Sequence, residues 1–186
     1  MDNFLINAGT YLVSTAFGLY IIIVLLRFLL QLTRADFYNP LSQFIVKATS
    51  PVLIPLRKVI RGFWGLDIAS LVLAYCLQYI ENILLFAITG SAINPIFLLW
   101  YSIGSLITLV LYIYFFAILM QVILSWINPG TYNPAIALIN HISEPIMRPA
   151  RRLLPPFSGF DLSPILVFVA LNILIMFVPV IFSHPF

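Results

Sequence analysis

The sequence predicts an all-α membrane protein with four transmembrane helices, arranged as two hairpins of the same orientation. Three observations lead to this fold class. Apolar residues make up 62% of the 186 residues, charged residues make up only 8%, and the mean hydropathy is +1.09. The apolar residues gather into four long runs, and the second half of the chain repeats the first. About a quarter of the residues in a soluble domain are charged, so this composition excludes one.

Each apolar run is long enough to cross a bilayer as a single helix. A spanning helix needs about 20 predominantly apolar residues. The four runs hold at most two charged residues each, and they cover residues 11–33, 66–90, 97–127 and 162–182. We therefore expect four spans in a single membrane domain. The net charge of +3 is then expected to mark the cytoplasmic side, and we expect no nucleic-acid partner.

The second half of the chain repeats the first half without a gap. Between residues 38–67 and 132–161, 10 of 30 aligned positions are identical. The identities include the pairs Pro51/Pro145, Pro55/Pro149, Arg57/Arg151 and Asp67/Asp161. Each repeat, 11–90 and 97–182, consists of a span, a connector and a second span. Because two spans are an even number, both repeats have the same orientation, and an axis along the membrane normal can relate them.

The connectors, residues 37–62 and 132–157, are expected to be helical although they are rich in proline. Each begins with the dipeptide Asn-Pro, which is typical of a helix start, with Asn as the N-cap and Pro in the first turn. Pro51 and Pro145 are expected to start a second short helix in a new direction. One turn later, Pro55 and Pro149 lack an N–H group and are expected to kink that helix.

The second short helix of each connector has an apolar stripe and a basic face. The apolar positions are Val52, Leu53, Leu56, Val59 and Ile60 in the first copy, and Ile146, Met147, Ala150, Leu153 and Leu154 in the second. The basic positions are Arg57, Lys58 and Arg61, and Arg148, Arg151 and Arg152. This pattern is typical of a helix in the headgroup layer, with its cations toward anionic lipid. Two alternatives stay open: the stripe packs on the protein's own spans, or the helices re-enter the membrane.

The distribution of basic residues predicts the topology. Eight of the nine lysines and arginines lie in or beside the connectors, and the N-terminus, the turn at 91–96 and the C-terminus have none. Cytoplasmic loops carry the excess of lysine and arginine in membrane proteins. We therefore expect both connectors to be cytoplasmic and both termini to lie outside.

The connectors also carry a family resemblance. The segment SEPIMRPARRLLPPFSGFDLSPIL, residues 143–166, resembles the signature of the YggT family, also called YlmG, of small bacterial integral membrane proteins. The segment TSPVLIPLRKVIRGFWGLDIASLV, residues 49–72, resembles a degenerate copy, with Arg61-Gly62 where the second copy has Pro155-Pro156. The resemblance covers nearly the whole chain, and it implies the bacterial inner membrane as the location.

The resemblance implies a cellular context rather than a chemistry. Members of the family are associated with osmotic or extracytoplasmic stress, including ion homeostasis. Relatives in cyanobacteria and chloroplasts are linked to haem attachment in cytochrome b6 and to nucleoid or division organisation. The family has no established catalytic residues, so the resemblance implies none here.

Two aspartates stand where a connector meets the next span. Asp67 and Asp161 each follow a glycine closely and open the second and fourth spans. A carboxylate at this position caps a helix by accepting free backbone N–H groups, and the helix dipole favours it. The alternative is that the repeat brings both together as a carboxylate dyad of an intramembrane enzyme.

Several polar residues interrupt the spans and predict an intramembrane polar seam. They are Arg27, Gln78, Glu81, Gln121 and Asn172, and the pairs Arg27/Gln121 and Gln78/Asn172 obey the repeat. Intramembrane polar groups mark a pathway or form hydrogen bonds that hold helices together, and both interpretations stay open. Glu81, the only acidic residue deep in a span, is the best single candidate for ion or proton handling; packing is the alternative.

The sequence predicts no cofactor, no metal site and no enzymatic activity. No C-x-x-C-H, H-E-x-x-H, Walker A or G-x-S-x-G motif is present. Our first hypothesis is a non-enzymatic protein that supports the envelope, the osmotic-stress response or membrane-protein assembly through scaffold and lipid contacts. The alternative is a small ion channel or transporter subunit that uses the seam around Glu81. Expected partners are anionic membrane lipids and other membrane proteins, with a homo-oligomer as an open question.

Overall fold

The computed structural model describes residues 2–60, 62, 65–127, 133–154 and 161–183. Within these residues the chain forms six helices and no strand. In chain order the helices are α1 (Asp2–Leu32), α2 (Pro40–Val59), α3 (Ile68–Ile88), α4 (Pro95–Ile127), α5 (Pro134–Leu153) and α6 (Ser163–Phe182).

The predicted fold class is confirmed. Four of the helices are long and apolar enough to cross a membrane: Asn3–Leu32, Ile68–Ile88, Pro95–Ile127 and Ser163–Phe182. These segments belong to α1, α3, α4 and α6. The helices α2 and α5 are the connectors, so each repeat is a span, a connector helix and a span.

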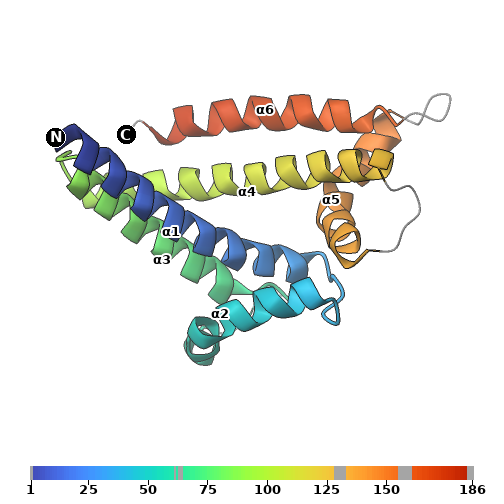
Figure 1. Ribbon diagram of the computed structural model, residues 1–186, viewed down its shortest axis with the longest axis horizontal. Coiled ribbons are helices and arrows are strands. Elements are labelled where there is room, and N and C mark those ends of the chain that lie inside the picture. Colours follow the sequence, from blue (N-terminus) through green and yellow to red (C-terminus); the bar gives the residue numbers. More distant parts are fainter. Residues whose placement is uncertain (1, 61, 63–64, 128–132, 155–160, 184–186) are drawn as a thin grey trace.

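The two repeats form two helical hairpins that meet through α3 and α4. The most extensive helix–helix packing is within each repeat, where α1 packs along α3 and α4 packs along α6. Figure 1 shows that α1 begins and α6 ends at one end of the molecule, while α2 and α5 lie toward the opposite end. Because the two connectors lie on the same side, the hairpins have the same orientation, as the even number of spans per repeat requires.

Each connector contains one helix, where the sequence predicted two short ones. In α2 the helix runs through Pro51 and Pro55, and in α5 it runs through Pro145 and Pro149. Proline removes one backbone hydrogen bond but keeps a φ angle that suits a helix, so these helices bend and continue. The ribbons of α2 and α5 change direction along their length in Figure 1.

Both connector helices start as the sequence predicted. The side chains of Asn39 and Asn133 accept hydrogen bonds from the amides of Leu41 (2.9 Å) and Ala135 (2.8 Å). Asn39 also links the two repeats, because its Nδ2 donates to the carbonyl oxygen of Pro134 at 2.6 Å. The first turns of α2 and α5 are therefore joined directly.

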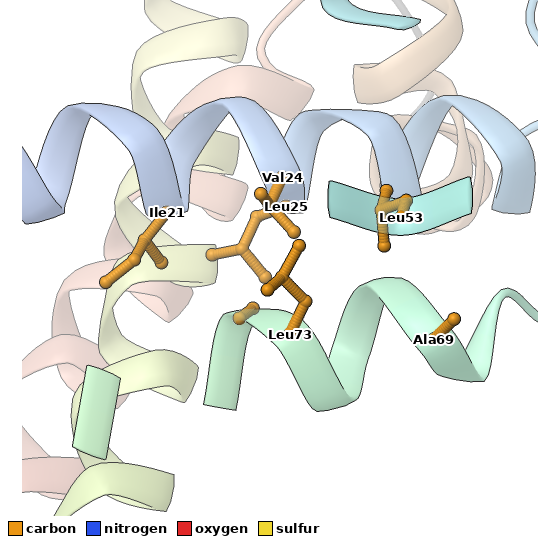
Figure 2. Packing of buried hydrophobic residues seen from close by; sticks show 7 residues of the cluster. Ile21, Val24, Leu25, Leu53, Ala69 and Leu73 are labelled. Carbon is orange, nitrogen blue, oxygen red and sulfur yellow. The ribbon is translucent and has the colours of Figure 1, made fainter. Parts of the chain in front are cut away.

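The first connector is packed into the protein's own core by part of its apolar stripe. Leu53 of α2 is fully buried between α1 and α3, where it joins Ile21, Val24, Leu25 and Leu73 in one cluster (Figure 2). Its repeat mate Met147 is equally buried against α4 and α6.

The ends of the same stripes are exposed. Val59 in α2 is 82% exposed, and Leu153 in α5 is 75% exposed. The stripe of each connector therefore divides into a part that packs on the spans and an end that the chain itself does not cover.

Candidate functional site

The junction between each connector and the following span is held by an arginine–aspartate pair. In the first repeat Arg57 Nε and Nη2 both donate to the carboxylate of Asp67. In the second repeat Arg151 Nε donates to Asp161 Oδ2 at 3.0 Å. The two ion pairs are repeat equivalents. We call each junction of a connector helix with the following span a corner, and the same two residue types hold both corners.

The two aspartates differ in how they meet the helix that they open. Asp161 Oδ1 accepts a hydrogen bond from the amide of Ser163 at 2.9 Å, but Asp161 stands one residue before Leu162, the N-cap of α6, which makes no side-chain capping bond. Asp67 is the N-cap residue of α3, but its side chain makes no capping bond to a backbone amide. The carboxylate of Asp67 instead accepts a hydrogen bond from the hydroxyl of Ser70.

Both carboxylates are held in the charged form. Burial alone would raise the pKa of Asp67, but hydrogen bonds from Arg57 and Ser70 hold this pKa below its usual range. Burial likewise opposes ionisation of Asp161, and bonds from Ser163 and Arg151 lower its pKa. The pKa of Arg151 is raised, because its carboxylate partners outweigh the effect of burial.

Each aspartate is bonded to the arginine of its own repeat, so the bonds shown here serve the corner and not a carboxylate dyad. Among the described residues, no three histidine, cysteine or acidic side chains gather where they could hold a metal ion.

Arg27 of α1 is not free in the span but bonded to the bend of α2. Its Nη1 donates to the carbonyl of Val46 (3.0 Å) and to the hydroxyls of Thr49 (2.5 Å) and Ser50 (3.2 Å). The side chain is 7% exposed. All three acceptors precede Pro51, so Arg27 ties the first span to the turn of α2 just before its proline.

The repeat mate of Arg27 makes no equivalent bond. Gln121 lies on α4, and its buried Oε1 has no hydrogen-bond partner within the described part of the chain. Two cations of α5 instead pair with an acidic residue of their own helix. Glu144 accepts Arg151 at 3.0 Å and lies 3.5 Å from Arg148.

Gln78 and Glu81 face a cavity between the four spans. Gln78 Nε2 donates to Glu81 Oε2 at 2.9 Å, and both side chains are 7% exposed. The cavity has a volume of about 380 Å³, and α1, α3, α4 and α6 all contribute to its lining. Its other polar lining residues are Ser14, Tyr101, Ser105, Thr108 and Tyr112.

The structure divides the predicted seam. Of its five residues, Gln78 and Glu81 line the cavity, and Arg27 is bonded to α2. Asn172, the repeat mate of Gln78, is exposed on α6 and donates to the carbonyl of Phe168 in its own helix at 2.8 Å. Gln121 does not line the cavity.

The remaining cations of the connectors point outward. Lys58, Arg148 and Arg152 are exposed, and Arg148 is 68% exposed despite its contact with Glu144. Lys58 and Arg152 make no ion pair with a described residue. Arg61, also predicted for this surface, lies outside the described residues.

Several residues of these sites escaped sequence reasoning. Ser14 and Thr108 are repeat equivalents, so the offset of 94 residues could have paired them, as it paired Gln78 with Asn172. Thr49, Ser50 and Glu144 gave no signal, because short polar residues and a single acid are ordinary in a connector helix.

The fold and these junctions define a class: a helical membrane protein made of two like-oriented repeats, each closed by an arginine–aspartate corner. The chain belongs to the CCB3/YggT family, whose model matches residues 6–88 and again residues 100–182. The second matched segment begins 94 residues after the first, which is the same offset that relates the two repeats in the sequence.

Relatives match over most of the chain. The uncharacterized protein PA0392 of Pseudomonas aeruginosa is 51% identical, over 92% of this chain and 88% of its own length. The uncharacterized protein YggT of Escherichia coli K12 is 38% identical, over 91% and 88%. A Vibrio alginolyticus protein described by its place in the proC 3′ region is 40% identical, over 89% and 90%. No solved structure matches the chain significantly.

Proposed function

We propose that this protein is a non-enzymatic inner-membrane scaffold that supports the envelope under osmotic stress, or the assembly of other membrane proteins, through lipid contacts of its connectors. The observation that carries the proposal is that the cations of α1 and of the two connectors divide into bonded and exposed ones. Arg27, Arg57 and Arg151 are bonded to the protein itself, whereas Lys58, Arg148 and Arg152 are exposed.

Exposed cations at one end of a membrane protein suit anionic headgroups. Each lysine or arginine near an anionic surface contributes about 1 kcal/mol to binding. The exposed apolar ends of the stripes, Val59 and Leu153, lie next to these cations in the sequence and add the apolar contact that an interfacial helix needs. The partners proposed are therefore anionic lipids, and membrane proteins that gather on the apolar spans.

The lipid contact can be measured on the full-length protein. A Lys58→Gln, Arg148→Gln, Arg152→Gln triple variant should bind phosphatidylglycerol bilayers more weakly by up to about 3 kcal/mol, with little change on phosphatidylcholine. The matched control is Lys58→Arg, Arg148→Lys, Arg152→Lys, which keeps the charge and should keep the binding. Equal losses on both lipids would show that these cations serve folding.

A cellular measurement connects the contact to the function. In a strain that lacks the gene, the wild-type protein and the charge-keeping control should restore growth at high osmolarity, and the glutamine triple variant should not. Full rescue by the glutamine variant would remove lipid contact from the proposal.

The proposed orientation places both connectors in the cytoplasm and both termini outside. In a Cys76→Ser background, Asn3→Cys and Ser183→Cys should react with an impermeant thiol reagent on intact spheroplasts. Lys58→Cys and Arg152→Cys should react only after the membrane is opened. Labelling of Arg152→Cys on intact spheroplasts would contradict this topology.

The cavity around Glu81 favours a second candidate function, a small ion channel or transporter subunit. An acidic residue inside a membrane protein is a common mark of an ion pathway. Ion flux into liposomes that contain the purified protein, lost in Glu81→Gln, would favour this candidate over the scaffold.

A further inference from the structure

The cavity between the four spans contains a carboxylate whose charge no described residue balances. Glu81 is 7% exposed, and no described arginine, lysine or histidine makes an ion pair with it. Its one hydrogen bond comes from a neutral amide, that of Gln78. An isolated charge in a low-dielectric interior is costly, so an ionised Glu81 requires a positive counter-charge.

Two hydroxyls in the lining of the cavity already donate to backbone carbonyls, which leaves their oxygen lone pairs for a ligand. The hydroxyl of Ser14 donates to the carbonyl of Tyr11 at 3.1 Å, and the hydroxyl of Ser105 donates to Tyr101 at 3.1 Å. Gln78 donates one N–H to Glu81, and its amide oxygen is an acceptor that can contact a ligand. The lining therefore offers neutral oxygen acceptors beside one carboxylate, a donor set that suits a hard cation.

The charge and the volume restrict the ligand. One carboxylate balances one positive charge, and a divalent ion would leave an uncompensated charge between the spans. A water molecule takes about 30 Å³ in the liquid, so a cavity of about 380 Å³ has room for an ion and several waters.

We propose that this cavity binds one partly hydrated monovalent inorganic cation, with Glu81 as its counter-charge and Gln78, Ser14, Ser105 and Thr108 as neutral oxygen ligands. The site goes beyond the scaffold function and requires no transport. Binding of the ion adds a bridge between α1, α3 and α4, the helices that carry these residues, and so ties the two repeats together.

The test is the thermal stability of the purified full-length protein in neutral-lipid nanodiscs at about pH 8, where an ordinary glutamate is ionised. NaCl and KCl are compared at equal ionic strength with N-methyl-D-glucamine chloride, whose organic ammonium is not a hard metal cation that oxygen ligands coordinate. A ligand at ten times its Kd makes the folded state about 11-fold more favourable. The melting temperature should therefore rise with Na⁺ or K⁺ and stay flat in Glu81→Gln.

Two further variants keep the test decisive if Glu81→Gln folds poorly. Ser105→Ala with Thr108→Val removes neutral ligands without touching the carboxylate. The Na⁺ or K⁺ concentration that gives half of the rise in melting temperature should increase by tenfold or more. Asn172→Ala, the change at the repeat mate of Gln78 on the exposed face of α6, should leave the response intact. The lipid-contact triple variant should also keep it, so that failure of the scaffold proposal and failure of this one are distinguishable.

Four outcomes overturn the proposal. They are equal stability in the three salts, a monovalent response that persists in Glu81→Gln, a larger stabilisation by Mg²⁺ at the same ionic strength, and a salt-insensitive wild type that Glu81→Gln stabilises. The last result would mean that a proton, not a metal cation, neutralises Glu81.

Discussion

The two connectors are copies of one sequence pattern, yet they place their charges differently. In the first connector the ion pair Arg57–Asp67 has a buried carboxylate, 5% exposed, whereas Asp161 of the second pair is 34% exposed. A buried arginine of α1 binds the bend of α2. The α5 helix has no such bond from Gln121, and two of its arginines, Arg148 and Arg151, pair with Glu144.

This difference separates structural charges from contact charges. A bonded, buried pair contributes to folding, because removing one partner leaves the other desolvated and unpaired. An exposed pair contributes little and stays available to a partner outside the chain. The first repeat therefore uses its charges mainly for the fold, and the second repeat offers more of them to the surroundings.

The largest expected effect tests this separation at the two corners. Asp67→Ala should cost about 2–3 kcal/mol, because it breaks charged hydrogen bonds at a buried site. Asp161→Ala should cost about 1 kcal/mol, mainly from the lost hydrogen bond with the Ser163 amide and a half-exposed ion pair. Thermal or denaturant unfolding in detergent measures both, and equal losses would show that the two repeats are held alike.

A second, smaller difference between the two hairpins is how tightly a glycine near the end away from the connectors is packed. A Cβ added at Gly104 of α4 would lie 2.4 Å from Cβ of Phe182, so Gly104→Ala must push α4 and α6 apart and should cost about 1–3 kcal/mol. A Cβ at Gly9 of α1 would meet Ile88 at an ordinary 3.7 Å. Gly9→Ala should therefore be neutral or stabilise by up to about 1 kcal/mol, since alanine favours a helix. Destabilisation by Gly9→Ala in the same unfolding assay would contradict the observed packing.

The smallest expected effect concerns acid. Because the folded-state pKa values of Asp67 and Asp161 are lowered, both carboxylates add stability above the unfolded-state value of about 3.9 and lose it as the pH falls through the lowered values. Stability should thus decline below about pH 4. The decline should be shallower in Asp67→Asn, which lacks one of these groups. An identical acid profile in Asp67→Asn and the wild type would remove the ion pair from this account.

Much of the architecture followed from the sequence, because lipid imposes simple rules. Apolar runs of sufficient length predicted the four spans, and the repeat predicted two hairpins of one orientation. The Asn-Pro pairs predicted where α2 and α5 begin. The prediction of two short helices per connector was wrong. A proline bends a helix without ending it where the surrounding residues pack on the spans.

The candidate sites were only partly predictable. Glu81 stood out as the single acid deep in a span. The division of the polar seam did not follow from the repeat: Gln78 faces the cavity, and its mate Asn172 lies exposed on α6.

The sequence by itself determined which segments cross the membrane, how they are repeated and where the cations gather, since these depend on local composition. Only the tertiary structure decided which side of each span faces the protein. A soluble helix shows its buried side by an apolar stripe, but a span such as α6 is apolar almost throughout, because lipid and protein core accept the same side chains. The burial of Arg27, the partner of Asp67 and the cavity at Glu81 therefore depend on how the helices are rotated against one another, which packing alone fixes.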